Sequence, residues 1–435
     1  MSRDREAAAL ALSVKWALRR VVPLVVLAGL FGGCDRPDAP TTAASPALAV
    51  VHHGGELDDT GCAPLPPISG FVGREDGALL IDRVAPYRAT GTNLYYLQQL
   101  LSYAQQDQDR DALRAVGEVL DDLVCLSLPV ARIWGFNDAA KDASSIRWSP
   151  EEGFREEGLR GLDQAVWEAK RRGIRLVLPL VNNWGEYGGL PAYAAWASKA
   201  FGGTYTHDDF FTSPSMKQWW KDYVYMLVNR VNTFTGVAYK DEPAILAWEI
   251  ANELRCQSCR GTTAFVDTVD ELATFLKQLA PDQLVSDGGD GFDDDPTLYA
   301  GLSNLYAVRG DEGSSFSKLS RVEALDMLSY HFYPRNYGVQ TARDAEIWIE
   351  RHQAIATITG KVAYLGECGF VAPDAERAQS YDTWLRSLFA SAGAQLAIFW
   401  QLSPAGRLDN DGFAVYSRRD NATAFILGRW GRAVR

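Results

Sequence analysis

The feature that most constrains the fold is a repeated alternation of short apolar runs with helical patterns, which starts at about Gly70. Strands that alternate with helices in this way predict a parallel α/β fold. Helical segments such as 158–172 and 216–232 separate the apolar runs. Eight predicted strands span residues 87–93, 131–135, 175–181, 245–250, 284–287, 327–331, 362–366 and 396–400. Eight units favour a closed (β/α)8 TIM barrel over the alternative, a doubly wound sheet.

Two further segments have a predicted position relative to the barrel. Residues 71–81, before the first strand, predict a small hairpin that closes the bottom of the barrel. The connection 182–242 is long and holds a helix together with a Gly- and aromatic-rich excursion. Because insertions after a strand's C-terminal end build the binding cleft of a barrel, we expect extended β/α loops here.

The N-terminus has the pattern of a targeting segment. Lys15, Arg19 and Arg20 precede the apolar run 21–31, which is too short to span a bilayer comfortably. The run ends at Gly33-Cys34 and resembles a bacterial lipobox. We therefore expect a signal segment over 1–34, a flexible linker over 35–67 and one barrel domain over 68–435. The protein would be exported, and lipidation at Cys34, plain secretion and a retained anchor stay open.

Charge and composition exclude several classes of partner. The net charge of −12 argues against nucleic acid, which requires a basic face. The five histidines form no HExxH or paired-His spacing, so we expect no metal and no other cofactor. We expect a monomer that meets a membrane through a lipid anchor alone. A neutral polymer is compatible with the charge as a substrate.

Polar and aromatic residues gather where the predicted strands end. The C-terminal rim of a barrel is where all eight loops converge, so residues there predict a binding or catalytic site. One such residue could be a solvated loop residue, but a full rim of them favours a site. The candidates for substrate binding are Arg132, Trp134, Asn183, Trp184, Asn252, His331, Tyr333 and Trp400.

Two carboxylates, Glu253 and Glu367, follow the fourth and seventh predicted strands. Retaining glycoside hydrolysis requires one carboxyl as acid/base and a second as nucleophile on the other side of the sugar carbon. We assign Glu253 as acid/base, with a pKa raised by the neighbouring negative charge, and Glu367 as nucleophile, kept ionised by Arg132 and Tyr333. Glu249, on the same strand as Glu253, is expected to be a structural ion-pair partner.

These residues resemble glycoside hydrolase family 5 endo-β-1,4-mannanases. The acid/base segment 246–256 (LAWEIANELRC) and the segment 182–189 (NNWGEYGG) carry the resemblance, and the latter points to mannanases. Further matches are RIW at 132–134, GTNLYY at 91–96, DGF at 290–292, YHFYP at 330–334 and LGE at 365–367. Leu254 replaces the usual Pro, and Cys368 replaces the usual aromatic residue, so both departures lie beside the catalytic pair.

The six cysteines include the pair Cys256 and Cys259 in a CxxC spacing. Zinc is disfavoured because no second CxxC or His pair accompanies it, and a short disulfide fits an exported chain. The resemblance implies a disulfide at this place. Cys125 and Cys368 lie near the second and seventh predicted strands, where they could be buried thiols, and the pairing of Cys62, Cys125 and Cys368 stays open.

The resemblance implies an endo-acting enzyme that cleaves β-1,4-mannosidic bonds in mannan, glucomannan or galactomannan with retention. The same mechanism on β-1,4-glucan and exo-β-mannosidase action are the near alternatives. A non-catalytic carbohydrate-binding barrel is the alternative from another class, and the presence of both glutamates with their predicted partners weighs against it.

We predict that the mature chain begins at a lipidated Cys34, because the charged, apolar and Gly-Gly-Cys succession is typical of lipoproteins. Mass spectrometry of the native N-terminus checks this prediction. A mature chain that begins at another residue, without a lipid on Cys34, would contradict it.

Overall fold

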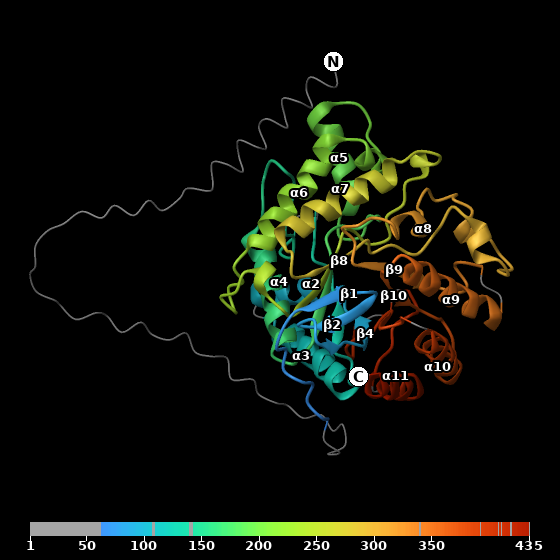
Figure 1. Ribbon diagram of the computed structural model, residues 1–435. Coiled ribbons are helices and arrows are strands. Elements are labelled where there is room, and N and C mark those ends of the chain that lie inside the picture. The colour runs from blue at the N-terminus through green and yellow to red at the C-terminus, as the bar shows by residue number, and fades with distance from the viewer. Residues whose placement is uncertain are drawn as a thin grey trace, which may run out of the picture.

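Eight parallel strands close into a barrel. In the computed structural model, which describes residues 62–434 except 107–108, 139–141, 339–340, 392, 408, 410 and 418–419, these strands form one ring in the order β10-β11-β4-β5-β6-β7-β8-β9 (Figure 1). The strands are β4 (Ala89–Asn93), β5 (Val130–Arg132), β6 (Arg175–Pro179), β7 (Ile245–Glu249), β8 (Leu284–Ser286), β9 (Met327–Phe332), β10 (Val362–Cys368) and β11 (Leu396–Phe399). All eight predicted strands and the (β/α)8 fold class are confirmed, and the doubly wound alternative is wrong because the sheet closes on itself.

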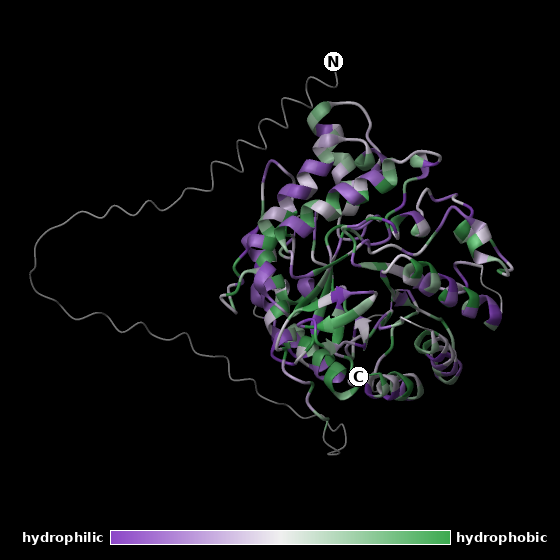
Figure 2. Cartoon of the chain, viewed as in Figure 1, coloured by the Kyte–Doolittle hydropathy of each residue, from purple (hydrophilic) through white to green (hydrophobic). Residues whose placement is uncertain are grey.

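Helices surround the barrel and shield the outer faces of its strands (Figure 1). Hydrophobic residues dominate the central strands, whereas the surrounding helices show hydrophobic and hydrophilic bands (Figure 2). Every barrel strand is fully buried, which is why the strands appear in the sequence as continuous apolar runs. The helices are α2 (Leu97–Gln106), α3 (Arg110–Cys125), α4 (Glu156–Lys170), α5 (Gly189–Phe201), α6 (Pro214–Asn229), α7 (Ala264–Leu279), α8 (Phe316–Leu319), α9 (Ala342–Ile358), α10 (Asp374–Ala390) and α11 (Asn421–Ala433), and the short 3-10 turns are η1 (His207–Phe211), η2 (Tyr239–Asp241), η3 (Gln257–Cys259), η4 (Pro296–Tyr299) and η5 (Tyr306–Val308).

The predicted hairpin is present and closes the N-terminal end of the barrel. It comprises β1 (Val72–Glu75) and β2 (Ala78–Ile81), to which β3 (Ala85–Pro86) adds a third antiparallel strand. Val72 and Leu79 are buried in one cluster with the barrel interior. The Leu79 amide donates to Gln395 Oε1 at 2.5 Å, and Gln395 Nε2 donates to the Gly77 carbonyl at 3.0 Å. The hairpin therefore seals the end of the barrel where the strands begin.

A buried ion pair fixes two of the extended loops at the opposite end. Arg147 contacts Asp138 at 3.3 Å and also donates to the Tyr193 hydroxyl at 2.6 Å. The Asp138 amide donates to the Tyr187 carbonyl at 2.8 Å. Because a buried charge is stable when it is paired and hydrogen-bonded, this pair holds the loops after β5 and β6 in one arrangement. Both loops contribute to the cleft described below.

Two disulfides lie within the described residues. Cys256–Cys259 is formed as predicted, and Cys125, whose pairing the sequence left open, is not a buried thiol but is disulfide-bonded. Cys125, at the end of α3, pairs with Cys62, and the nearby Leu65 is buried against the barrel core. The segment expected to be linker through residue 67 is thus attached to the barrel from Cys62 onward. Cys368 is a buried free thiol, as expected.

The predicted signal segment, Cys34 and linker residues 35–61 lie outside the described residues. Within the described part of the chain, no helix is long and apolar enough to cross a membrane.

The two disulfides should differ in their contribution to the free energy of unfolding. Chain entropy gives about 4 kcal/mol for the Cys62–Cys125 loop, with a sequence separation of 63, and about 1–2 kcal/mol for the Cys256–Cys259 loop, with a separation of 3. Guanidinium unfolding of the double variants Cys62→Ser/Cys125→Ser and Cys256→Ser/Cys259→Ser measures both losses. An equal or larger loss for the CxxC pair would refute this ranking.

Candidate active site

A cleft of about 1020 Å³ opens at the C-terminal ends of the barrel strands. All eight strands, or the loops that follow them, contribute side chains to it, as the rim pattern of the sequence predicts. The lining residues in strand order include Tyr95, Trp134, Asn182, Trp184, Tyr187, Asn252, Glu253, Phe292, Tyr333, Glu367 and Trp400. Several of these are aromatic, and such faces can stack on sugar rings.

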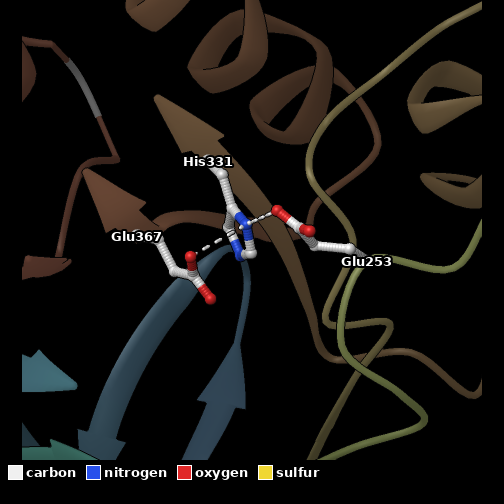
Figure 3. A group of neighbouring side chains, drawn as sticks. All are labelled: Glu253, His331 and Glu367. Atoms are coloured by element: carbon white, nitrogen blue, oxygen red, sulfur yellow. Dashed lines mark hydrogen bonds and ion pairs between the residues drawn. The ribbon is translucent and has the colours of Figure 1, made fainter. Parts of the chain in front are cut away.

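Glu253 and Glu367 approach each other across the cleft, with His331 between them (Figure 3). One oxygen of each carboxylate and a ring nitrogen of His331 all lie within 4.8 Å of one another. His331 Nδ1 is 2.7 Å from Glu253 Oε1 and 3.6 Å from Glu367 Oε2. Carboxyl groups about 5 Å apart are typical of retaining glycoside hydrolases, whereas inverting enzymes separate them by about 6.5–9.5 Å. The spacing thus leaves no room for a water between carboxylate and sugar.

Local backbone irregularities direct both carboxylates into the cleft. Glu253 follows β7 with a φ of +53°, in the left-handed region, and its amide donates to the Gly288 carbonyl at 2.9 Å. Glu367 follows a register shift between Leu365 and Glu367 in the pairing of β10 with β9. A bulge of this kind re-aims the side chains that follow it. Gly366 suits the bulge, since a Cβ there would lie 2.4 Å from Ser329 Oγ.

Glu367 accepts two strong hydrogen bonds. Arg132 Nη1 donates to its Oε1 at 2.6 Å, and the Tyr333 hydroxyl donates to its Oε2 at 2.5 Å. Arg132 is fully buried and also bonds Glu249, with Nη2 2.7 Å from Glu249 Oε2. The prediction of Glu249 as a structural ion-pair partner is therefore confirmed.

Glu253 is held from both sides. Its Oε2 accepts a hydrogen bond from Trp184 Nε1 at 2.6 Å, and its Oε1 is hydrogen-bonded to His331 Nδ1 at 2.7 Å. Burial would raise the pKa of Glu253, but the hydrogen bond and charge of His331 and the donor on Trp184 lower it to about 2. The expectation of a raised pKa for Glu253 is therefore wrong, because His331 and Trp184 together outweigh burial.

The pKa of His331 is raised, since the charges of Glu367 and Glu253 and the hydrogen bond to Glu253 outweigh the lowering effect of burial. Burial also raises the pKa of Glu367, against the lowering effects of His331 and Arg132. Arg132 and Tyr333 bond Glu367 as predicted, yet burial outweighs them. His331, with its raised pKa, therefore lies 2.7 Å from Glu253, in position to exchange a proton with it.

The structure brings most of the predicted site residues together. Trp134, Trp184, Asn252, Tyr333 and Trp400 line the cleft with the two glutamates. Arg132 and His331 are fully buried and contact the carboxylates instead of the open cleft.

Asn183, predicted to bind substrate, does not border the cleft. Its Oδ1 accepts from the Arg255 amide at 3.0 Å, and Asn182 lies at the cleft in its place. Side chains just past a strand end no longer alternate regularly between the two faces. The sequence pattern therefore did not show that Asn182, and not Asn183, borders the cleft.

Other functional residues were not predicted. Asn93 Oδ1 accepts from Arg132 Nη1 at 3.0 Å, and its position at the end of the first barrel strand could have identified it. Tyr95 stacks on Trp400 with ring centroids 5.0 Å apart, and Arg407 donates to the Tyr95 hydroxyl at 3.0 Å. Arg407 and Asp411 come from the loop after β11, where no motif pointed to them.

Glu253, His331 and Glu367 form a group that could ligate a metal ion. However, Trp184, Arg132 and Tyr333 already donate hydrogen bonds to these carboxylates. A buried arginine at 2.6 Å from one of them also repels a cation. The donor set is thus suited to proton transfer and to charge stabilisation by protein groups.

A closed (β/α)8 barrel with two carboxylates at this spacing in an aromatic-lined cleft defines a retaining glycoside hydrolase. Comparison with known proteins specifies the family. A family profile described as GH family 5 beta-mannosidase-like matches residues 69–361, and the chain belongs to this family.

Relatives and solved structures agree with this assignment. The chain is 33% identical over 357 residues to a putative mannan endo-1,4-beta-mannosidase 4 of Arabidopsis thaliana, covering 78% of this chain and 85% of that protein. It is similar to the endo-beta-1,4-mannanase of Thermotoga petrophila, with 32% identity, a TM-score of 0.71 and coverage of 80% and 77%. It is also similar to the endo-1,4-beta-mannanase of Rhizomucor miehei, with 28% identity, a TM-score of 0.72 and coverage of 84% and 99%.

We predict that the basic limb of the kcat/KM profile reports the His331–Glu253 pair and lies above the ordinary imidazole pKa of about 6.5. Since the pKa of His331 is raised, the pair should lose its proton at a higher pH than a free imidazole does. The variant His331→Gln should move the limb to lower pH, because Glu253 alone then holds the proton.

The matched control is His207→Gln, since His207 pairs with Asp208 at 3.2 Å but does not line the cleft. Its profile should superimpose on that of the unmodified enzyme. A basic limb that stays in place in His331→Gln would show that the pair does not set it.

Proposed function

We propose that this glycoside hydrolase is an endo-acting β-1,4-mannanase that cleaves mannan, glucomannan or galactomannan with net retention. The observation that carries the mechanism is the distance of at most 4.8 Å between the carboxylate oxygens of Glu253 and Glu367. The names of the similar proteins support the substrate, since they are endo-1,4-mannosidases or mannanases. The cleft, at about 1020 Å³, is large enough for several sugar units and so suits internal cleavage of a polymer.

In the proposed first step, Glu253 gives a proton to the glycosidic oxygen as the bond from that oxygen to the anomeric carbon breaks. An oxygen of Glu367 attacks the anomeric carbon and forms a glycosyl ester. His331 Nδ1 lies 2.7 Å from Glu253 Oε1 and can pass a proton to it. When the ester forms, Glu367 loses its charge, and its hydrogen bonds from Arg132 and Tyr333 weaken. They regain their strength when hydrolysis of the ester restores the carboxylate.

In the second step, Glu253 takes a proton from a water molecule, and the resulting oxygen attacks the anomeric carbon from the face that the leaving group vacated. The ester bond breaks, and the electron pair returns to Glu367. Trp184 Nε1, 2.6 Å from Glu253 Oε2, favours the ionised form of Glu253 that this step requires. Trp400 and Tyr95 offer a stacked aromatic wall against the bound sugar.

We also propose that the protein is exported and tethered through Cys34. The disulfides Cys62–Cys125 and Cys256–Cys259 support export, because disulfides persist in oxidising compartments.

The test of the proposed function is cleavage of linear manno- and cello-oligosaccharides by the purified chain. We expect internal cleavage and a kcat/KM on manno-oligosaccharides roughly tenfold or more above that on cello-oligosaccharides. A preference for cello-oligosaccharides would identify a glucanase, and release of single sugars from one end would identify an exo-enzyme.

Catalytic variants provide the controls. Glu367→Ala should abolish turnover, whereas Glu253→Ala should lose about 10²- to 10⁴-fold on polymer but retain the first step on a substrate with an activated leaving group. Azide should rescue Glu253→Ala with formation of a β-glycosyl azide, and should give the α-azide with Glu367→Ala. The opposite anomer in each case would mean that the two roles are reversed.

A further inference from the structure

A chain of hydrogen bonds runs from the floor of the cleft across the barrel interior to β8. Arg132 Nη1 donates to Glu367, and its Nη2 and Nε donate to Glu249 at 2.7 and 2.9 Å. The Tyr364 hydroxyl donates to Glu249 Oε1 at 2.5 Å, and it lies 3.0 Å from Ser286 Oγ. The four groups behind Glu367 come from β5, β7, β10 and β8, all of them buried.

The bonds that Arg132 and Tyr364 make in this chain have a defined direction. The single hydrogen of the Tyr364 hydroxyl is used by Glu249, and the Ser286 hydroxyl lies 3.0 Å from the Tyr364 oxygen while it also donates to Asp287 Oδ1 at 3.3 Å. Burial and the charge of Glu249 raise the pKa of Tyr364, so the hydroxyl stays a neutral donor. Donors in a buried chain strengthen one another, and the bonds from Arg132 and Tyr364 stabilise the charge on Glu249.

We propose that Tyr364 is a positioning residue for the nucleophile: its hydroxyl fixes Glu249, which orients the Arg132 guanidinium toward Glu367. This inference rests on the proposed function through the role of Glu367. Glu249 holds the Nε and Nη2 edge of Arg132, which leaves Nη1 directed at Glu367 Oε1 and Asn93 Oδ1. If Glu249 lost its second donor, it would draw Arg132 toward itself and away from Glu367.

The bulge in β10 explains how Tyr364 and Glu367 share the barrel interior. Residues an odd number of positions apart face opposite sides of a regular strand. The register shift between Leu365 and Glu367 inserts one position, so both side chains face inward. Tyr364 joins the interior cluster with Val362, whereas Ala363 and Leu365 pack outside against the helices. A tyrosine at position 364 thus reaches the ion pair that lies beneath the nucleophile.

The test compares Tyr364→Phe with the matched control Tyr330→Phe. Tyr330 is a buried tyrosine on the neighbouring strand β9, but its hydroxyl accepts from Gln353 Nε2 at 3.1 Å on the outer side of the barrel. Both variants lose one buried hydroxyl, so a general loss of stability affects them alike. The readout is the rate of glycosyl-enzyme formation on an aryl β-mannoside with an activated leaving group, which depends little on Glu253.

We expect Tyr364→Phe to slow glycosyl-enzyme formation about tenfold with little change in KM, because the nucleophile is misdirected but the cleft is intact. Tyr330→Phe should stay within about twofold of the unmodified enzyme, since it loses no contact to the nucleophile. An unchanged rate in Tyr364→Phe, or an equal loss in both variants, would overturn the proposal.

Two further measurements keep the test decisive. A crystal structure of Tyr364→Phe should show that the 2.6 Å contact of Arg132 with Glu367 is lost, and an unchanged contact would overturn the proposal whatever the substrate is. If Tyr364→Phe does not fold, Ser286→Ala replaces it, with an expected loss of about threefold in the same step. Failure of the proposed function would appear separately, as turnover that persists in Glu367→Ala.

Discussion

The site depends on one buried cation. Arg132 has no exposed surface and bonds Glu249 and Glu367, two carboxylates that repel each other without it. Burial would lower the pKa of Arg132, but the charges of Glu249 and Glu367 raise it, so the guanidinium stays charged. Removal of one partner from a buried ion pair costs about 3–5 kcal/mol, because the remaining charge is left in a low dielectric. Arg132 therefore couples the stability of the barrel to the geometry of the nucleophile.

In this barrel the charged groups around Arg132 lie on strands, whereas other residues that border the cleft lie on loops. Arg132, Glu249 and Glu367 lie on strands whose backbone is fixed by parallel pairing on both sides. In contrast, Trp184 and Arg407, which border the cleft, come from the loops after β6 and β11. Loops tolerate change without loss of the fold, so one set of reacting groups can serve different polysaccharides. This division explains why the reaction type follows from the geometry while the substrate requires an experiment.

The sequence predicts the features that depend on local pattern. Eight apolar runs located the strands, and their polar ends located Glu253 and Glu367 on one rim. The partner of Cys125 was not predictable, because several connectivities are open when six cysteines are present and the choice depends on where residues 62–65 pack. The pKa direction of Glu253 was wrong because it depends on which carboxylate the His331 ring faces, a matter of three-dimensional orientation.

The two positions that local pattern describes least well are those of the reacting carboxylates. A regular strand would direct Tyr364 and Glu367 to opposite faces, and a residue without glycine's freedom is rarely found at the φ of +53° of Glu253. A left-handed backbone at a residue other than glycine costs about 1–3 kcal/mol and persists where surrounding contacts define it. Here the Glu253 amide is bonded to the Gly288 carbonyl, and Glu367 is held by Arg132 and Tyr333. The regular strands thus keep the barrel rigid. The two irregularities, each fixed by hydrogen bonds, direct Glu253 and Glu367 toward each other across the cleft.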